Sequence, residues 1–185
     1  MRNKVAVGIM VLVMSGALAA PAMAEERVCR GAIGAVTVDN LRVPSDSTCA
    51  LSGTYVKGTI KVERGATLHA SAVRVIGNVQ GEGAARVNVV NSSQVGGSVQ
   101  VKQGGAARVA DSRINADIQF DSQRGELIAS SNVVGGNIQA MKNTGGVAIS
   151  HNRVDGNLQC KENRPAPTGG GNIVNGNKED QCSRL

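Results

Sequence analysis

The feature that most constrains the fold of this chain is a tetrapeptide that recurs every 19 or 20 residues. Its general form is Gly-Asn-φ-Gln, where φ is aliphatic, and it begins at positions 77, 97, 116, 136 and 156 as GNVQ, GSVQ, ADIQ, GNIQ and GNLQ. The same spacing continues toward the N-terminus through TIKV and NLRV. The resulting marker column is Arg42, Lys61, Gln80, Gln100, Gln119, Gln139 and Gln159. Such regularity predicts stacked copies of one small unit.

The composition of the repeat favours a parallel β-solenoid. Each unit is rich in β-branched residues, Gly, Asn and Ser, and its apolar residues show no helical period. Leucine-rich repeats share the period, but they need several leucines per unit, and this chain has few. The sequence therefore predicts an all-β fold, a single-stranded parallel β-helix (solenoid) of about seven coils with 19-20 residues per coil, over residues 39–175.

Aliphatic residues recur in columns that we expect to face the interior. The first column precedes each marker and contains Leu41, Ile60, Val79, Val99, Ile118, Ile138 and Leu158. A second contains Val90, Val109, Ile128 and Ile149, and a third contains Val75, Val95, Ile114, Val133 and Val154. The position after each marker also faces inward, and there Phe120 and Ala140 alternate in size, as a narrow core requires. The marker side chains face outward as a ladder, in which stacked amides bond one another.

The first 24 residues have the pattern of a secretory signal peptide. Arg2 and Lys4 precede an apolar run over residues 5–13, and the small residues Ala22 and Ala24 mark a cleavage site. Removal of the leader lowers the net charge from +6 to +4, because it holds two basic residues and no acidic one. We expect an exported protein, periplasmic or extracellular, with no integral membrane segment after cleavage.

The four cysteines are Cys29, Cys49, Cys160 and Cys182, and an even count in an exported chain favours disulfides. No Cys-x-x-Cys occurs, so we expect no metal, and no cofactor is expected either. In a solenoid, Cys49 and Cys160 lie about 29 Å apart, which leaves Cys29–Cys49 and Cys160–Cys182 as feasible pairs. These pairs would fasten an N-terminal cap segment, residues 25–38, and a C-terminal tail, residues 176–185. We expect a monomer while oxidised and self-association after reduction.

Two segments carry a family resemblance. NLRVPSDSTCALSGTYVKGTIKVERGATL and GNLQCKENRPAPTGGGNIVNGNKEDQC resemble the two ends of an uncharacterised family of exported bacterial repeat proteins. The resemblance implies a parallel β-solenoid with cysteine-bearing ends, and it implies no activity and no catalytic residues. In valine and glycine spacing alone, the chain is also similar to bactofilin-type polymerising solenoids.

Three arginines recur at one position on alternate coils. Arg74, Arg113 and Arg153 are expected about 10 Å apart, with Gln94 and Asn132 between them. Such a row predicts binding of an anionic polymer through charge, and the candidate partners are an anionic polysaccharide or another envelope component. Like charges spaced to limit repulsion are the competing explanation.

A catalytic site is harder to find. Lys102, Asp111, Arg113, Asp117 and Asp121 fall in adjacent coils, as in polysaccharide lyases built on β-helices. However, coils of 19 or 20 residues leave no room for the insertions that form a cleft, and the chain has one Tyr and one Phe for contacts with sugars. We therefore expect an exported non-catalytic β-solenoid that acts as a structural or surface-interaction module. The alternative is a polyanion- or glycan-binding protein, and a polysaccharide lyase ranks third.

Overall fold

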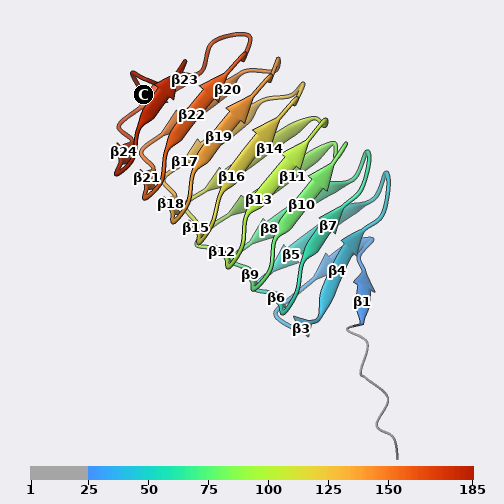
Figure 1. The fold of residues 1–185 in the computed structure, drawn as a ribbon. Coiled ribbons are helices and arrows are strands. Elements are labelled where there is room, and N and C mark those ends of the chain that lie inside the picture. The colour runs from blue at the N-terminus through green and yellow to red at the C-terminus, as the bar shows by residue number, and fades with distance from the viewer. Residues whose placement is uncertain (1–24) are drawn as a thin grey trace, which may run out of the picture.

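The computed structural model describes residues 25–185, which form a rod of three parallel β-sheets, called A, B and C below (Figure 1). Sheet A contains, in spatial order, β1 (Glu26–Val28), β4 (Asn40–Val43), β7 (Ile60–Val62), β10 (Val79–Glu82), β13 (Val99–Lys102), β16 (Ile118–Asp121), β19 (Ile138–Met141), β22 (Leu158–Lys161) and β25 (Lys178–Asp180). Sheet B contains β2 (Gly31–Ile33), β5 (Thr48–Ser52), β8 (Thr67–Ser71), β11 (Arg86–Val90), β14 (Ala106–Ala110), β17 (Leu127–Ser130), β20 (Val147–Ser150) and β23 (Thr168–Gly170). Sheet C contains β3 (Thr37–Val38), β6 (Tyr55–Val56), β9 (Arg74–Val75), β12 (Gln94–Val95), β15 (Arg113–Ile114), β18 (Val133–Val134), β21 (Arg153–Val154) and β24 (Ile173–Val174).

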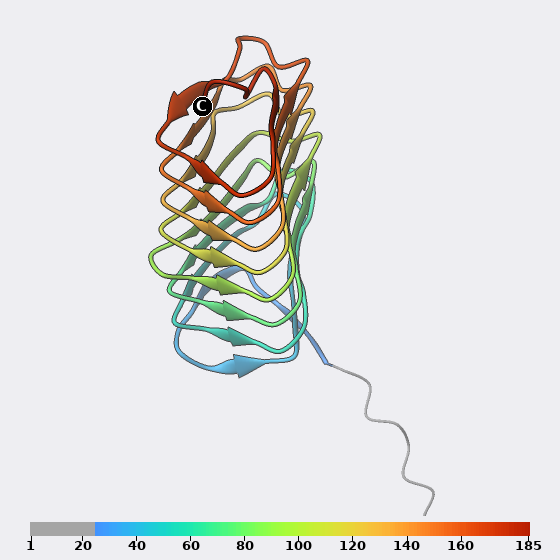
Figure 2. The same cartoon turned by 60° about the vertical axis from the view of Figure 1, so that its left-hand side comes forward.

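The predicted all-β solenoid is confirmed, but it has about eight coils rather than about seven. The additional coil consists of residues 25–38, which contribute β1, β2 and β3. The repeat pattern misses this coil because Val28, which is neither Gln nor a cation, pairs with Arg42 at the marker position. Figure 2 shows how each coil contributes one strand to each sheet. Within residues 25–185, no helix is long and apolar enough to cross a membrane.

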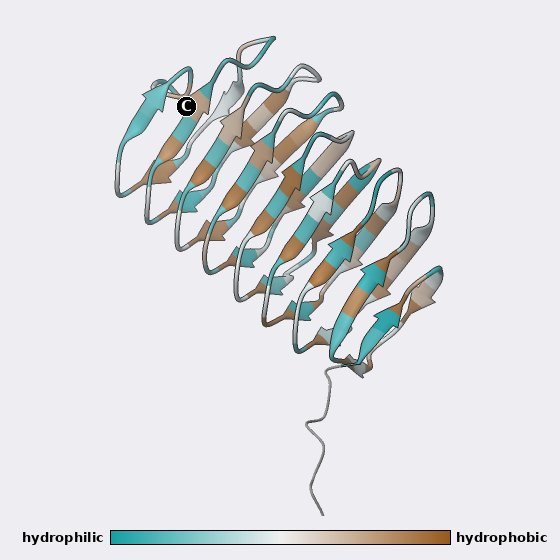
Figure 3. Cartoon of the chain, turned by 45° about the vertical axis from the view of Figure 1, so that its right-hand side comes forward, coloured by the Kyte–Doolittle hydropathy of each residue, from teal (hydrophilic) through white to brown (hydrophobic). Residues whose placement is uncertain are grey.

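The interior of the rod is a narrow stack of aliphatic columns, which appear as brown bands along the strands in Figure 3. In sheet A the predicted register is confirmed, because each marker pairs with the marker of the next coil. Phe120 is 1% exposed and lies between Val101 and Ala140. A large side chain thus packs next to a small one, and the core stays closed.

The predicted columns of sheets B and C are wrong at three positions. In sheet B, Val89 and Ala129 are buried, whereas Val90 and Ile128 lie at outward positions. In sheet C, the inward residue of β18 is Val134, and Val133 pairs with Arg113 on the outer face. Each error falls where two consecutive residues are apolar, because apolarity alone cannot decide which of two neighbours faces inward.

Side-chain ladders hold the corners of the coils. At the corner between sheets C and A, side-chain oxygens accept N–H bonds from the next coil, as from Ser98 to Asn78 at 2.8 Å and from Asn157 to Asn137 at 2.8 Å. The members of this ladder are Asn40, Thr59, Asn78, Ser98, Asp117, Asn137 and Asn157. These bonds satisfy backbone groups that would otherwise lack partners at a turn.

Two further asparagine ladders are buried, and they were not predicted from the repeat pattern. Asn132, Asn152 and Asn172 stack at the corner between sheets B and C, and Asn143 and Asn163 stack between sheets A and B. The Nδ2 group of Asn152 donates to the carbonyl of Ala129 at 2.9 Å and to Asn172 Oδ1 at 2.9 Å. Each buried amide is therefore satisfied by the adjacent coils.

Candidate interaction surfaces

The outer face of sheet A carries the predicted amide ladder. Gln80 donates to Gln100 at 3.4 Å, Gln100 donates to Gln119 at 3.1 Å, and Gln139 donates to Gln159 at 2.9 Å. The Nε2 group of Gln119 contacts Asp117 instead of Gln139, so the ladder has one break. All marker positions from Arg42 to Gln159 lie on this face in one register.

A second outward row runs beside the ladder and contains charges of both signs. Its members in successive strands are Glu82, Lys102, Asp121, Met141 and Lys161. Where this row meets the ladder there is a surface hollow of about 470 Å³. The charged residues that line it are Lys61, Glu63, Arg64, Glu82 and Lys102. The hollow thus presents three cations, two carboxylates and amides of the ladder. Its surface is polar and carries charges of both signs.

Two ion pairs link neighbouring coils at the N-terminal end of sheet A. Arg42 forms salt bridges with Glu26 and Glu63, and the hydrogen bonds that it donates to these two carboxylates raise the pKa of its guanidinium. The pKa of Glu63 is lowered, first by a hydrogen bond from the backbone N–H of Ser45 and then by the Ser45 hydroxyl. Arg42 is therefore engaged by two carboxylates and is not a free cation for a ligand.

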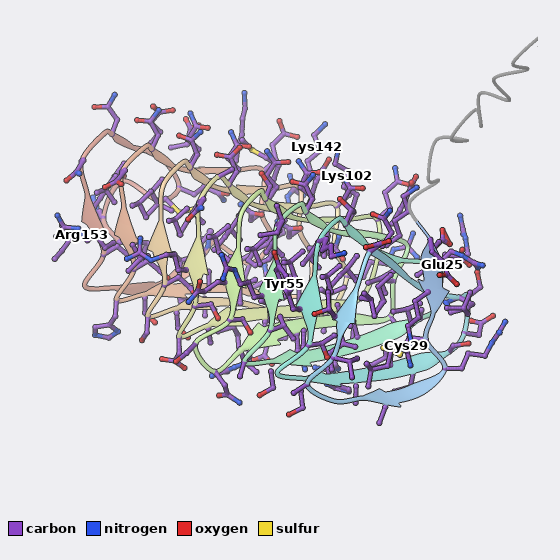
Figure 4. All side chains as sticks on the ribbon, turned by 90° about the horizontal axis from the view of Figure 1, so that it is seen from below. Glu25, Cys29, Tyr55, Lys102, Lys142 and Arg153 are labelled. Carbon is purple, nitrogen blue, oxygen red and sulfur yellow. A yellow bond between two sulfur atoms is a disulfide. The ribbon has the colours of Figure 1, made fainter. Side chains whose placement is uncertain are left out.

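The arginine row lies on the outer face of sheet C. The pairing register aligns Arg74, Gln94 and Arg113, and then Val133 and Arg153. Val133, and not the predicted Asn132, separates the last two arginines, because Asn132 is buried in the corner ladder. Arg153 extends near the C-terminal end of the rod, away from the edge that carries Lys102 and Lys142 (Figure 4).

Tyr55 begins the same outward row and was not part of the predicted site. It pairs with Arg74, whose guanidinium carbon lies 5.4 Å from the centre of the tyrosine ring. The spacing of 19 residues between Tyr55 and Arg74 equals one repeat, and this spacing could have placed Tyr55 in the row. Among residues 25–185, the salt bridges involve Arg42 and Lys57 and none of the three arginines of the row. The three arginines are exposed, and within the described residues none of them forms a salt bridge.

The residues of the candidate lyase site are not brought together. Lys102 and Asp121 are paired neighbours in sheet A, whereas Arg113 lies on sheet C and Asp117 belongs to the corner ladder. Asp111 lies at the other corner of sheet C, between β14 and β15. Within the described part of the chain there is also no group of three or more His, Cys, Asp or Glu side chains that could hold a metal ion.

Both predicted cysteine pairs are formed. Cys29 and Cys49 have Cα atoms 5.6 Å apart and join the first two coils, and Cys160 and Cys182 have Cα atoms 5.2 Å apart and join β22 to the tail. Cys182 is fully buried, and Leu185 packs against the core beside it. The two disulfides therefore pin the two ends of the rod.

The fold and its side-chain ladders define a parallel β-solenoid protein. Comparison with models of protein families, with curated proteins and with solved structures finds no match to this chain. The resemblance of its two end segments to exported repeat proteins therefore remains a hypothesis.

Proposed function

We propose that this protein is an exported, non-catalytic β-solenoid that acts as a structural or surface-interaction module. The observation that carries the proposal is the outer face of sheet A, where Gln80, Gln100 and Gln119 bond to one another along the rod. Amides held by their neighbours present donors and acceptors at regular intervals along the rod, and such a row suits contact with an extended or repetitive partner. The partner class that we propose is an envelope component.

Export is supported by the two disulfides, because such bonds persist in oxidising compartments. The signal-peptide prediction concerns residues 1–24, which lie outside the described residues. Cell fractionation with mass spectrometry of the N-terminus tests it. We expect the chain in the periplasm or the medium, beginning at Glu25. An uncleaved chain in the cytosolic fraction would refute export.

Retention on insoluble envelope material from the source cells tests the interaction. We expect Gln100→Ala, Gln119→Ala and Gln139→Ala together to reduce retention, because they remove three of the five outward glutamine amides of sheet A. A matched control removes three exposed amides elsewhere, through Asn115→Ala, Asn175→Ala and Asn177→Ala, and should keep wild-type retention. Equal retention of both variants contradicts the proposed face. Shortening of polysaccharide chains by the wild-type protein contradicts the non-catalytic assignment.

A second candidate function, polyanion binding, is favoured by the arginine row of sheet C. Arg74, Arg113 and Arg153 are exposed, share one outward row and lie on alternate coils, which spaces them by about 9.6 Å. Their charges would add along a linear anionic polymer that follows the axis of the rod.

Affinity for heparin or alginate, measured at several salt concentrations, tests this second function. We expect replacement of the three arginines by Gln to weaken binding, and the wild-type affinity to fall as salt rises. The matched control is Lys61→Gln, Lys102→Gln and Lys161→Gln, which removes the same charge from sheet A. Equal losses in both variants indicate net charge alone, and the absence of binding removes this function while leaving the first proposal intact.

A further inference from the structure

The outward row of sheet C holds apolar side chains as well as arginines. From β6 to β24 the pairing register aligns Tyr55, Arg74, Gln94, Arg113, Val133, Arg153 and Ile173. In the second half of the row, arginines therefore alternate with aliphatic residues. Ile173 is 59% exposed, the highest value among the large hydrophobic side chains of residues 25–185. Between β6 and β24 no carboxylate belongs to this row.

Apolar exposure also occurs beside the other end of the row. Ile76 follows β9 directly, two residues after Arg74, and it is 46% exposed. Successive residues of an extended segment alternate between faces, so Arg74 and Ile76 both point outward. On the adjacent coil, the ring of Tyr55 lies 5.4 Å from the guanidinium carbon of Arg74. Both ends of the row thus combine cations with exposed apolar side chains.

The shape of the row suits a flat partner. Each strand of sheet C contains two residues, of which one faces the core, so the sheet is one outward residue wide. These strands lie along one straight edge of the rod (Figure 1). From Tyr55 to Ile173 the row crosses six strand spacings, or about 29 Å. A planar surface parallel to the axis of the rod can therefore touch all members of the row at once.

A bilayer surface with anionic head groups matches both kinds of side chain. Phosphates attract guanidinium groups, while Tyr, Val and Ile side chains gain from contact with the boundary between head groups and acyl chains. The flexible arginine stems allow the charged ends to stay at the level of the phosphates. A hydrated polysaccharide would engage the arginines and leave Ile76 and Ile173 in water. We infer that the outer face of sheet C is a docking surface for an anionic lipid bilayer, on which the rod lies lengthwise.

This inference rests on the anion binding proposed above for the arginine row, and it names the ligand. Two carboxylates limit the attraction. Asp111 lies at the corner before β15, and Asp155 lies at the corner after β21, where its Oδ1 accepts a bond from Asn175 at 3.0 Å. Both are exposed and flank the row. Because the arginines exceed these acids by one charge only, docking should be reversible and should weaken as salt rises.

Tyr55 makes the docking directly measurable. The chain contains one Tyr and no Trp, so tyrosine fluorescence reports on this row alone. The oxidised mature protein is mixed with vesicles of phosphatidylcholine, or of equal parts phosphatidylcholine and phosphatidylglycerol. We expect about tenfold tighter binding to the mixed vesicles at low salt. We also expect quenching of Tyr55 when the lipids of the mixed vesicles carry brominated acyl chains.

Two matched variants separate a lipid surface from a soluble polymer. The row variant carries Ile76→Ser, Val133→Ser and Ile173→Ser. The control carries Val28→Ser, Val90→Ser and Ile128→Ser, at outward positions of sheets A and B. Circular dichroism establishes that each variant is folded. We expect the row variant to lose most of its vesicle binding and to keep the wild-type affinity for heparin, whereas the control keeps both.

Three results would overturn the inference. They are equal binding of the wild type to neutral and mixed vesicles, equal vesicle binding of the row variant and the control, and Tyr55 fluorescence that brominated chains do not quench. If heparin or alginate still binds in any of these cases, the polyanion function stands with a soluble polymer as its ligand. Absence of binding to both vesicles and polymers removes the inference and the polyanion function together.

Discussion

Phe120 and Ala140 are paired neighbours on one inward column, so the largest side chain of the core is accommodated by one of the smallest in the next coil. This relationship makes the stability of the rod sensitive to Phe120. We expect Phe120→Ala to cost about 3 to 5 kcal/mol, because it loses burial energy and leaves a cavity beside Ala140. Denaturant unfolding measures this cost, and Gln119→Ala, on the outer face of the same strand, is the control. A loss below about 1 kcal/mol would contradict the packing.

The stability of the rod should also depend on the buried asparagine ladder at the corner between sheets B and C. Asn152 accepts bonds from the backbone N–H and the Nδ2 group of Asn132, both at 3.0 Å, and donates to two further groups. Asn152→Ala leaves these buried partners unsatisfied, at about 1 to 3 kcal/mol for each group. In urea unfolding, this variant should lose clearly more stability than Asn175→Ala, which removes an exposed amide from the same rod. Equal stability of the two variants would argue against the ladder.

The disulfides should stabilise the rod by restricting the unfolded chain. Cys29 and Cys49 are separated by 20 residues, and a loop of this length corresponds to about 3 kcal/mol in the chain-entropy model. We expect Cys29→Ser with Cys49→Ser to lose about this amount in unfolding experiments under oxidising conditions. Non-reducing peptide mapping of the wild type should link Cys29 to Cys49 and Cys160 to Cys182. A peptide that links the two ends of the chain would contradict the order of the coils.

Acid sensitivity should depend on Glu63. Hydrogen bonds from Ser45 lower the pKa of Glu63 below its ordinary value of 4.5, with Arg42 contributing in the same direction. A carboxylate with a lowered folded-state pKa contributes stability above its unfolded pKa, and this contribution is lost as pH falls through the folded pKa. The difference in unfolding free energy between wild type and Glu63→Gln should therefore be constant above about pH 5 and shrink below pH 4.5. In a Ser45→Ala background, which lacks the hydroxyl that donates to Glu63, this pH dependence should be smaller. The same pH dependence with and without the hydroxyl would assign the effect to general charge.

The marker column illustrates how much of the surface could be predicted. A period of 19 or 20 residues is enough to align Gln80 with Gln100 and Gln119, because a strand that repeats at a fixed interval can pair in only one register. The arginine row was found for the same reason, although Val133 was misassigned beside it. Tyr55 was missed because a Tyr in a column of arginines and amides breaks the chemical pattern while keeping the spacing.

The sequence by itself determined the solenoid, its period, the register of sheet A and the two feasible cysteine pairs, because each follows from repetition along the chain. The tertiary structure alone decided the direction of adjacent apolar residues such as Val133 and Val134, since both satisfy the same pattern until neighbouring coils pair. It also decided that Asn152 is buried, because an asparagine in a turn enters the core only when adjacent coils supply its partners. The ends of the inward column in sheet A are a third case. Arg27 and Lys178 lie far apart in the chain, and only the pairing of neighbouring coils shows that they stand at the two ends of one column.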